Sequence, residues 1–174
     1  MTLFSGFETT FALFVRDLFG LNIKHTSYLF VYIGLLSLLI QGGIIRKAKG
    51  SIKLFSYLGL GLVGFGFLAI SVSATLPALL ASLALLCLGV AFTNSFLPAL
   101  LSILIQSDIK GTVMGIFESN GSLGRIIGPI IGSILVLRDP RQAYLFFAFV
   151  LFMTIGSMLI LSKSSPLPSS EEEP

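Results

Sequence analysis

The stretch PALLASLALLCLGVAFTNSFLPALLSIL, residues 77–104, decides the fold class of this chain. It contains no Asp, Glu, Lys or Arg. It is also longer than the about 20 apolar residues that an α-helix needs to cross the roughly 30 Å hydrocarbon core of a bilayer. Because the apolar residues are continuous and do not alternate as in a membrane β-strand, the stretch is predicted to be a transmembrane helix.

Five more apolar stretches surround it, at about 3–15, 27–45, 54–73, 112–136 and 142–162. All but the first are long enough to span. The stretch 3–15 reaches only about 20 Å at about 1.5 Å per residue. It could be an interfacial helix or a signal peptide, but it lacks a basic leading region and a small-residue cleavage site. The favoured interpretation is a first helix without its N-terminal turns, which would make the chain a fragment.

The composition agrees with a chain whose solvent is lipid. Hydrophobic residues make up 55% and charged residues 11% of the sequence, and the mean hydropathy is +0.99. Soluble domains carry about 25% charged residues. The net charge of +3 is small and concentrated in one loop, so nucleic acid is not an expected partner. Cys87 is the only cysteine and cannot form a disulfide within the chain.

The distribution of Lys and Arg predicts the orientation. Four basic residues crowd one short connection: Arg46, Lys47, Lys49 and Lys53. Because cytoplasmic loops carry the excess of Lys and Arg, this connection and the C-terminus are predicted to face the cytoplasm of a cell-membrane protein. The segment 164–174 is rich in Ser, Pro and Glu and is predicted to be a disordered cytoplasmic tail.

Three charged residues fall inside predicted spans: Glu8, Glu118 and Arg125. Such residues are costly in lipid and usually face a cavity or a partner, so each is a candidate functional residue. Glu8 could instead lie at a frayed helix end, and Glu118 could simply be hydrated near the headgroups. Arg125 is near the middle of its span and needs an acceptor, which could be a carboxylate of another helix, helix-end carbonyls or water. Glu118 is about 10 Å away along the same helix, too far for an easy direct bond.

The neutral polar residues Gln41, Asn94 and Asn120 also lie in or near spans. Each could form a hydrogen bond between helices without touching a substrate, for about 0.6–2 kcal/mol. As a group they favour a hydrated interior, and they are therefore pathway candidates as well.

Small residues and prolines mark helix packing. Glycines recur at every fourth position, at Gly124, Gly128 and Gly132, and form a stripe on which another helix backbone can approach closely. Pro129 removes the hydrogen bond that its nitrogen would donate to the carbonyl of Arg125 and is expected to kink the helix. Pro98 is expected to kink the span 77–104 in the same way.

The run GTVMGIFESNGSLGRIIGPIIG, residues 111–132, resembles the eleventh helix of major facilitator superfamily transporters, especially the tetracycline-efflux-like drug:proton antiporters. Other motifs are similar in the same order: residues 6–11 to the seventh helix, 40–50 to the eighth helix and the basic loop after it, and 88–98 to the tenth helix. The basic loop is short here and lacks the acidic residue that the family often has, which weakens the case for a cytoplasmic charge lock.

This resemblance implies an all-α membrane protein whose six helices form the C-terminal half of a twelve-helix major facilitator fold, built from two inverted three-helix repeats. It further implies proton-coupled efflux of small molecules or drugs by alternating access, with the N-terminal half as partner. A half-size transporter acting as a homodimer and a non-transporting scaffold remain alternatives. The sequence has no GxxxxGK[ST] loop, no metal-ligand cluster and no catalytic set, so no cofactor, metal or enzymatic reaction is expected.

Overall fold

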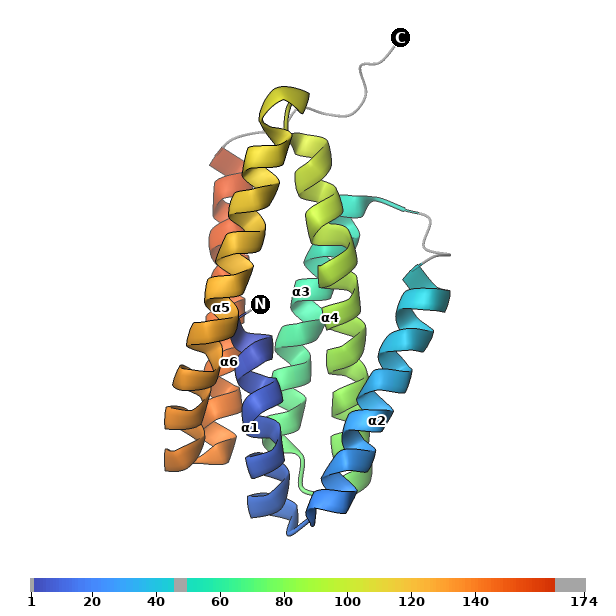
Figure 1. Ribbon diagram of the computed structural model, residues 1–174, viewed down its shortest axis with the longest axis vertical. Helices are drawn as coiled ribbons and strands as arrows, with labels where there is room; N and C mark the ends of the chain where they lie inside the picture. Colours follow the sequence, from blue (N-terminus) through green and yellow to red (C-terminus); the bar gives the residue numbers. More distant parts are fainter. Residues whose placement is uncertain (1, 46–49, 165–174) are drawn as a thin grey trace.

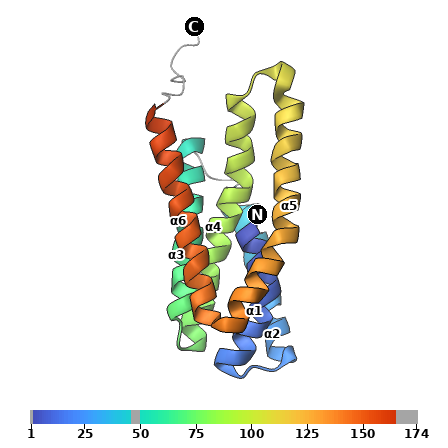
Figure 2. The same cartoon turned by 90° about the vertical axis from the view of Figure 1, so that its left-hand side faces the viewer.

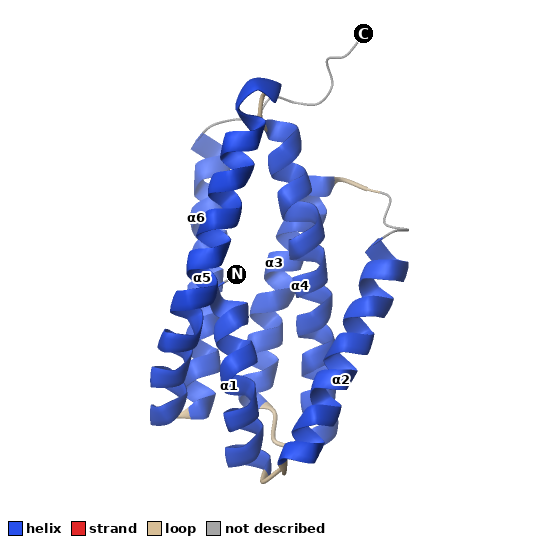
Figure 3. Ribbon diagram, viewed as in Figure 1, coloured by secondary structure: helices blue, strands red, loops and turns tan. Residues whose placement is uncertain are grey.

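Helices account for almost all of the described residues, 2–45 and 50–164, of the computed structural model. Six are α-helices: α1 (Thr2–Phe19), α2 (Ile23–Leu39), α3 (Ile52–Val72), α4 (Leu76–Leu104), α5 (Lys110–Arg138) and α6 (Pro140–Ser164). A π-helical segment, η1 (Ile40–Ile45), prolongs α2, and a 3₁₀ turn, η2 (Ser107–Ile109), precedes α5. Figure 3 shows that the remaining described residues are short connections between these helices.

The helices run along one long axis and form a bundle (Figure 1). The connections α1–α2, α3–α4 and α5–α6 lie at the lower end of Figure 1, whereas the α4–α5 connection and the end of α6 lie at the upper end. We call these the lower and upper ends. Helix α1 begins about halfway up the bundle and descends to the lower end, as the turned view also shows (Figure 2).

Four segments of the described chain are long and apolar enough to cross a membrane: Ile23–Gly43, Ile52–Val72, Leu76–Leu104 and Ser107–Arg138. Their burial within the bundle differs. In the apolar windows of the segments formed by α3 and α4, 44% of the residues are buried, against 17% for the α2 segment and 22% for the α5 segment. Of these four segments, α3 and α4 therefore bury the larger share of their residues within the bundle, while α2 and α5 present most of theirs outward.

Local sequence explains where α1 ends and where α6 begins. Gly20 adopts a positive φ of 62°, and its N–H bonds the carbonyl of Arg16 at 3.0 Å, which closes α1 as a left-handed cap. The apolar stretch of sequence ends at Arg16, and the helix continues three residues beyond it. At the start of α6, the Asp139 carboxylate accepts hydrogen bonds from the Arg141 N–H and the Gln142 side-chain amide, both at 2.9 Å.

The core is rich in aromatic side chains from α1, α3 and α6. Five rings are almost completely enclosed there and contact one another edge-on or stacked: Phe7, Phe14, Phe67, Tyr144 and Phe147. The Tyr144 hydroxyl lies 3.4 Å from the Thr10 hydroxyl, which also donates to the Gly6 carbonyl at 2.7 Å. This pair satisfies the polar end of an otherwise apolar cluster.

Helices α3 and α4 pack backbone against backbone. A Cβ added at Gly89 of α4 would lie 2.5 Å from the backbone nitrogen of Val63, and one at Gly66 of α3 would lie 2.9 Å from Cα of Leu86. The absence of a side chain at both positions permits this approach, which is the usual device for close helix packing in lipid.

Parts of two sequence-based predictions fall outside the described residues. These are the basic residues Arg46, Lys47 and Lys49 and the tail from residue 165 onward. Ser164, the first residue of the predicted tail, is the last residue of α6. The apolar span 27–45 is not one uniform α-helix, because its last six residues, which include two adjacent glycines, form η1.

Candidate functional site

Two of the three charges expected inside spans, Glu8 and Arg125, belong to the adjoining helices α1 and α5. The positive charge of Arg125 acts on the carboxylate of Glu8, and both side chains are exposed on the bundle surface. From the sequence alone, the carboxylate considered as a partner of Arg125 was Glu118 on the same helix. In the structure, the Glu8 carboxylate lies on the adjoining helix α1, more than a hundred residues earlier in the chain.

A hydrogen bond beside this pair follows from the chemistry of proline. Pro129 has no N–H, so it cannot donate to the carbonyl of Arg125 four residues earlier, as a regular helix requires. The hydroxyl of Ser5 on α1 donates to that carbonyl at 3.2 Å. The carbonyl that Pro129 leaves without its usual helical donor is therefore used to join α5 to α1.

The glycine stripe of α5 faces α1 at the same level. Gly124, Gly128 and Gly132 are all buried. A Cβ added at Gly6 of α1 would lie 2.8 Å from the Gly128 carbonyl oxygen, and one at Gly132 would lie 3.1 Å from the Gly6 carbonyl oxygen. The two backbones are therefore in direct contact, which fixes the positions from which the side chains of Glu8 and Arg125 extend.

A cleft with polar side chains is lined by α4 and α5 in its smaller part, and by residues of α1, α3, α4, α5 and α6 in its larger part. It consists of two adjoining cavities of about 220 and 550 Å³, both lined by Thr93 and Asn94. Asn120 and Pro98 line the smaller cavity, so the structure brings the predicted residues Asn94 and Asn120 to one place. The larger cavity reaches Gly128 of α5 and is otherwise mostly apolar.

The other predicted pathway residues lie apart from this cleft. Gln41 is exposed within η1 at the end of α2, and Glu118 is exposed on α5. Neither lines these two cavities. Helices α4 and α5 continue through Pro98 and Pro129 as single elements.

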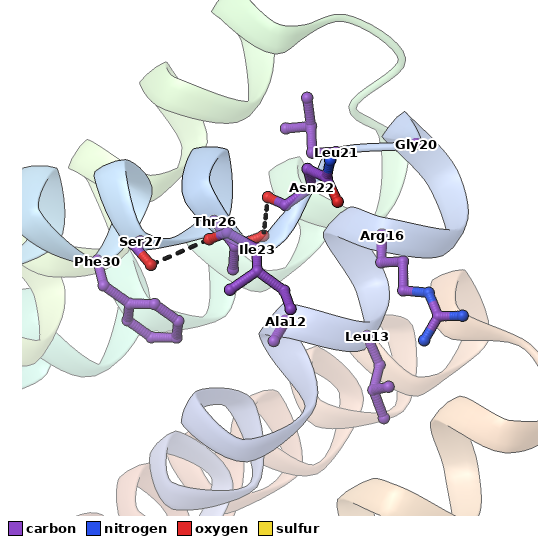
Figure 4. A pocket seen from close by; sticks show the side chains of 10 residues that line it. All are labelled: Ala12, Leu13, Arg16, Gly20, Leu21, Asn22, Ile23, Thr26, Ser27 and Phe30. Carbon is purple, nitrogen blue, oxygen red and sulfur yellow. Dashed lines mark hydrogen bonds between the residues drawn. The ribbon is translucent and has the colours of Figure 1, made fainter.

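A third cavity, of about 790 Å³, opens at the lower end between the end of α1 and the start of α2 (Figure 4). Arg16 is its charged residue. The hydroxyls of Thr26 and Ser27 line it but donate to the carbonyls of Asn22 and Ile23 in their own helix, at 3.3 and 3.0 Å. No sequence motif indicated this cavity, because it depends on the angle between two helices.

Within the described residues, no group of three or more His, Cys, Asp or Glu side chains could hold a metal ion. The features that stand out are instead two opposite charges inside spans of neighbouring helices and a cleft with two amide side chains, in a bundle of apolar helices. A multi-pass membrane protein of the transporter class has this combination.

The comparison with protein families is specific. Residues 1–129 match the family model of the Major Facilitator Superfamily, and the chain belongs to that family. The prediction of an all-helical membrane protein with a major facilitator fold is thereby confirmed, and the family's members here are transporters and not enzymes.

Curated and solved relatives agree with this assignment. The chain is 28% identical to major facilitator superfamily domain-containing protein 10 of Mus musculus, over 98% of this chain and 38% of that protein. It is 27% identical to multidrug resistance protein 2 of Bacillus subtilis, over 90% of this chain and 39% of that protein. The crystal structure of the human organic anion transporter MFSD10 superposes with a TM-score of 0.79 at 27% identity, covering 88% of this chain and 37% of that one. The chain thus spans about two fifths of the length of these relatives.

Proposed function

We propose that this chain is the C-terminal six-helix half of a secondary active transporter that moves small molecules by alternating access. The observation that carries the proposal is the cleft lined by Asn94 and Asn120, within a bundle of the Major Facilitator Superfamily that also has Glu8 and Arg125 inside its spans. Charged groups are retained inside membrane spans mainly where they face a pathway or a partner, and substrate sites of such transporters lie near mid-membrane between two bundles.

The proposed partner is a second six-helix bundle, in the same polypeptide or in another one. It would cover the face on which α5 and α2 lie on either side of α1 (Figure 1). Of the four segments long enough to span a membrane, those formed by these two helices bury the smallest share of their residues within the bundle. Exposed large apolar side chains follow both of them, including Val31, Leu35, Leu38, Ile116, Leu123 and Ile127. Rocking of one bundle against the other would then open the cleft to each side of the membrane in turn.

The energy source that we propose is a proton gradient, with the basic connection after η1 and the C-terminus in the cytoplasm. Drug efflux in exchange for protons is the form that the resemblance to tetracycline-efflux-like antiporters implies. The relatives support a broader range of small molecules, since one is named a multidrug resistance protein and another an organic anion transporter. The single guanidinium at mid-span favours organic anions among these substrates.

Transport assays in proteoliposomes test the proposal. The purified chain alone, reconstituted in vesicles with an imposed proton gradient, should show no substrate-dependent proton flux, because its polar cleft lacks an opposing wall. A transporter in which this chain follows an N-terminal six-helix half should show such flux, and Arg125→Gln should abolish it while leaving membrane abundance unchanged.

Three results would contradict this proposal. Flux through the chain alone would favour a half-size transporter that works as a homodimer. Unchanged flux in a well-folded Arg125→Gln transporter would remove Arg125 from the pathway, and the loss of abundance in both Arg125→Gln and Arg125→Lys would assign it to packing.

A further inference from the structure

The cavity of about 790 Å³ at the lower end has a simple depth order, because two helices leave one short connection (Figure 4). Helix α1 descends to the connection at residues 20–22, and α2 rises from it. At about 1.5 Å per residue, Arg16 and Ser27 lie about 6 Å above the connection. Ala12 and Phe30 lie about 10–12 Å above it, so they form the inner level of the cavity.

Polar and apolar lining groups are separated by this depth. All the polar side chains lie within about one turn of the connection, and they are Arg16, Asn22, Thr26 and Ser27. The inner level has apolar side chains only, and these are Ala12, Leu13 and Phe30. Leu21 and Ile23 complete the mouth of the cavity. A phospholipid has the same order, with its phosphate at the membrane surface and its acyl chains inward.

The cavity also lies at the right level of the membrane for a lipid headgroup. All four described segments that are long and apolar enough to cross a membrane begin or end at the lower end, at Ile23, Val72, Leu76 and Arg138. The mouth of the cavity is therefore at the headgroup level, and its inner level reaches the hydrocarbon. Arg16 lies about one turn inside the end of α1, from where a long basic side chain can extend to the interface.

The donors of the cavity are free for a ligand. In the part of the chain that the structure describes, the Arg16 guanidinium makes no hydrogen bond or ion pair, and neither does the Asn22 side-chain amide. A guanidinium can bind two phosphate oxygens at once. No carboxylate lines the cavity, so nothing there attracts the amine of a zwitterionic headgroup. The charge of the cavity therefore favours an anionic headgroup.

The apolar walls are open to lipid. The exposed fractions of Leu13, Phe30 and Ile23 are 38%, 39% and 84%. An acyl chain between α1 and α2 would cover these side chains, while the hydroxyls of Thr26 and Ser27 keep their bonds within α2. A volume of about 790 Å³ is within the range of roughly 300–1,000 Å³ that small-molecule sites have. It can hold a headgroup and the first part of an acyl chain.

We propose that this cavity binds one phospholipid with a negatively charged headgroup. Its phosphate is at Arg16, and one acyl chain follows the groove between α1 and α2 towards the level of Phe30. The site goes beyond the transport function and does not rest on it, because it requires only this bundle in a bilayer.

Fluorescence quenching by brominated lipids tests the proposal. The chain has no tryptophan, so Phe30→Trp places a single fluorophore at the inner level of the cavity. The purified chain is reconstituted in phosphatidylcholine vesicles, in which part of the lipid carries bromine on its acyl chains. At equal mole fractions, brominated phosphatidylglycerol should quench more strongly than brominated phosphatidylcholine. The expected preference is about fivefold in relative binding, the effect of one Arg near a membrane surface.

Three variants separate this site from general contact with lipid. Arg16→Gln, combined with Phe30→Trp, should remove the preference for phosphatidylglycerol. Lys24→Gln is the matched control, since it removes the same charge from a residue that follows the same connection but does not line the cavity. It should leave the preference unchanged. Phe65→Trp on α3 is exposed outside the cavity and should be quenched equally by both lipids.

Melting temperatures establish that each variant is folded, and Leu13→Trp provides a second reporter on the α1 wall. Equal quenching by the two lipids at both reporters would overturn the proposal, as would a preference that survives Arg16→Gln. Quenching of Phe65→Trp without quenching of Phe30→Trp would overturn it too, because protein would then cover the cavity. Replacing chloride by inorganic phosphate at constant ionic strength should not relieve the quenching. Relief by phosphate would assign the site to a soluble anion instead.

Discussion

Pro129 has no backbone N–H to bond the Arg125 carbonyl, so this carbonyl accepts a hydrogen bond from a polar residue of α1. The donor is the Ser5 hydroxyl, at 3.2 Å. In Pro129→Ala the new N–H would bond this carbonyl within α5. We therefore expect Ser5→Ala to lower the free energy of unfolding by about 0.6–2 kcal/mol in the unmodified chain, and by less in the Pro129→Ala background.

A double-mutant cycle measures this dependence, with unfolding followed in mixed micelles of increasing denaturing detergent. Thr9→Ala is the matched control, since the Thr9 hydroxyl donates to the Ser5 carbonyl within its own helix and not to α5. Equal effects of Ser5→Ala in both backgrounds would show that Pro129 has no part in the bond.

Tyr144 gives a second prediction at the scale of one residue. Its ring is fully enclosed by aromatic neighbours, whereas its hydroxyl makes one long contact with Thr10. Thr10 keeps its shorter bond to the Gly6 carbonyl when the tyrosine hydroxyl is removed. Tyr144→Phe should therefore cost about 1 kcal/mol or less, and Tyr144→Ala about 3–5 kcal/mol because it leaves a cavity. Thermal unfolding of both variants checks this, and similar losses would contradict it.

The sequence indicates candidate polar residues but not which of them are neighbours in space. Glu8, Asn94, Asn120 and Arg125 are candidates because polar groups are costly in lipid. Helical spacing relates residues of one helix, so it could bring Glu118 into consideration for Arg125 but could not reveal Glu8. That pairing depends on how α1 and α5 cross, which is a property of the packed bundle.

At the scale of the helices, close packing of α3 against α4 makes a sharp prediction. Gly89→Ala places a Cβ against the backbone of Val63, where no flexible side chain can give way. We expect a loss of about 1–3 kcal/mol in stability from overpacking. Gly61→Ala on α3 is the matched control, since nothing lies within 4 Å of its added Cβ. It should be neutral or slightly stabilising because alanine favours helix.

Unfolding in denaturing detergent and abundance in the membrane, measured for both variants, test this prediction. Equal stability of Gly89→Ala and Gly61→Ala would contradict the prediction, because it would mean that α3 and α4 can move apart to accommodate the added Cβ at Gly89. The sequence indicated a packing stripe only on the later helix of Gly124, Gly128 and Gly132. It did not indicate the seam between α3 and α4, because Gly59 and Gly66, which both face α4, are spaced seven residues apart and not four.

Helix limits were predictable where a local signal ends the helix and less so elsewhere. The predicted span 77–104 differs from α4 by one residue at its start, since Pro77 and the preceding Thr75 mark a helix beginning. The first apolar stretch ends at Arg16, but α1 runs to Phe19 because the helix stops only at the left-handed Gly20. A charged residue can therefore end an apolar stretch of sequence without ending the helix that contains it.

For the whole molecule, the arrangement of connections predicts which residues are reachable from each side of the membrane. Ser51 and Ala74 are exposed and precede and follow α3, respectively. Cysteines placed there, in a Cys87→Ala background, should react with an impermeant maleimide from opposite sides. Ser51→Cys is expected to react only in inverted vesicles, since the basic connection is predicted to be cytoplasmic.

Labelling of Ser51→Cys in intact cells would reverse this orientation. Labelling of both cysteines from one side would contradict α3 as a spanning helix. The number and order of helices followed from hydropathy alone, because lipid permits few alternatives to a complete helix. The cleft lined by Asn94 and Asn120 could not be predicted from hydropathy, because its width depends on the tilt of the helices and on the position at which α1 begins.

The contact between α1 and α5 also has a consequence during synthesis of the protein. Ser5 and Arg125 are separated by 120 positions in the chain. At about 5–20 residues per second, a ribosome needs roughly 6–24 s to reach Arg125 after Ser5 has been made. Throughout that interval the Arg125 guanidinium is not available to Glu8. Insertion of α1 before α5 has been made would therefore place the Glu8 carboxylate in lipid without this opposite charge, which is costly.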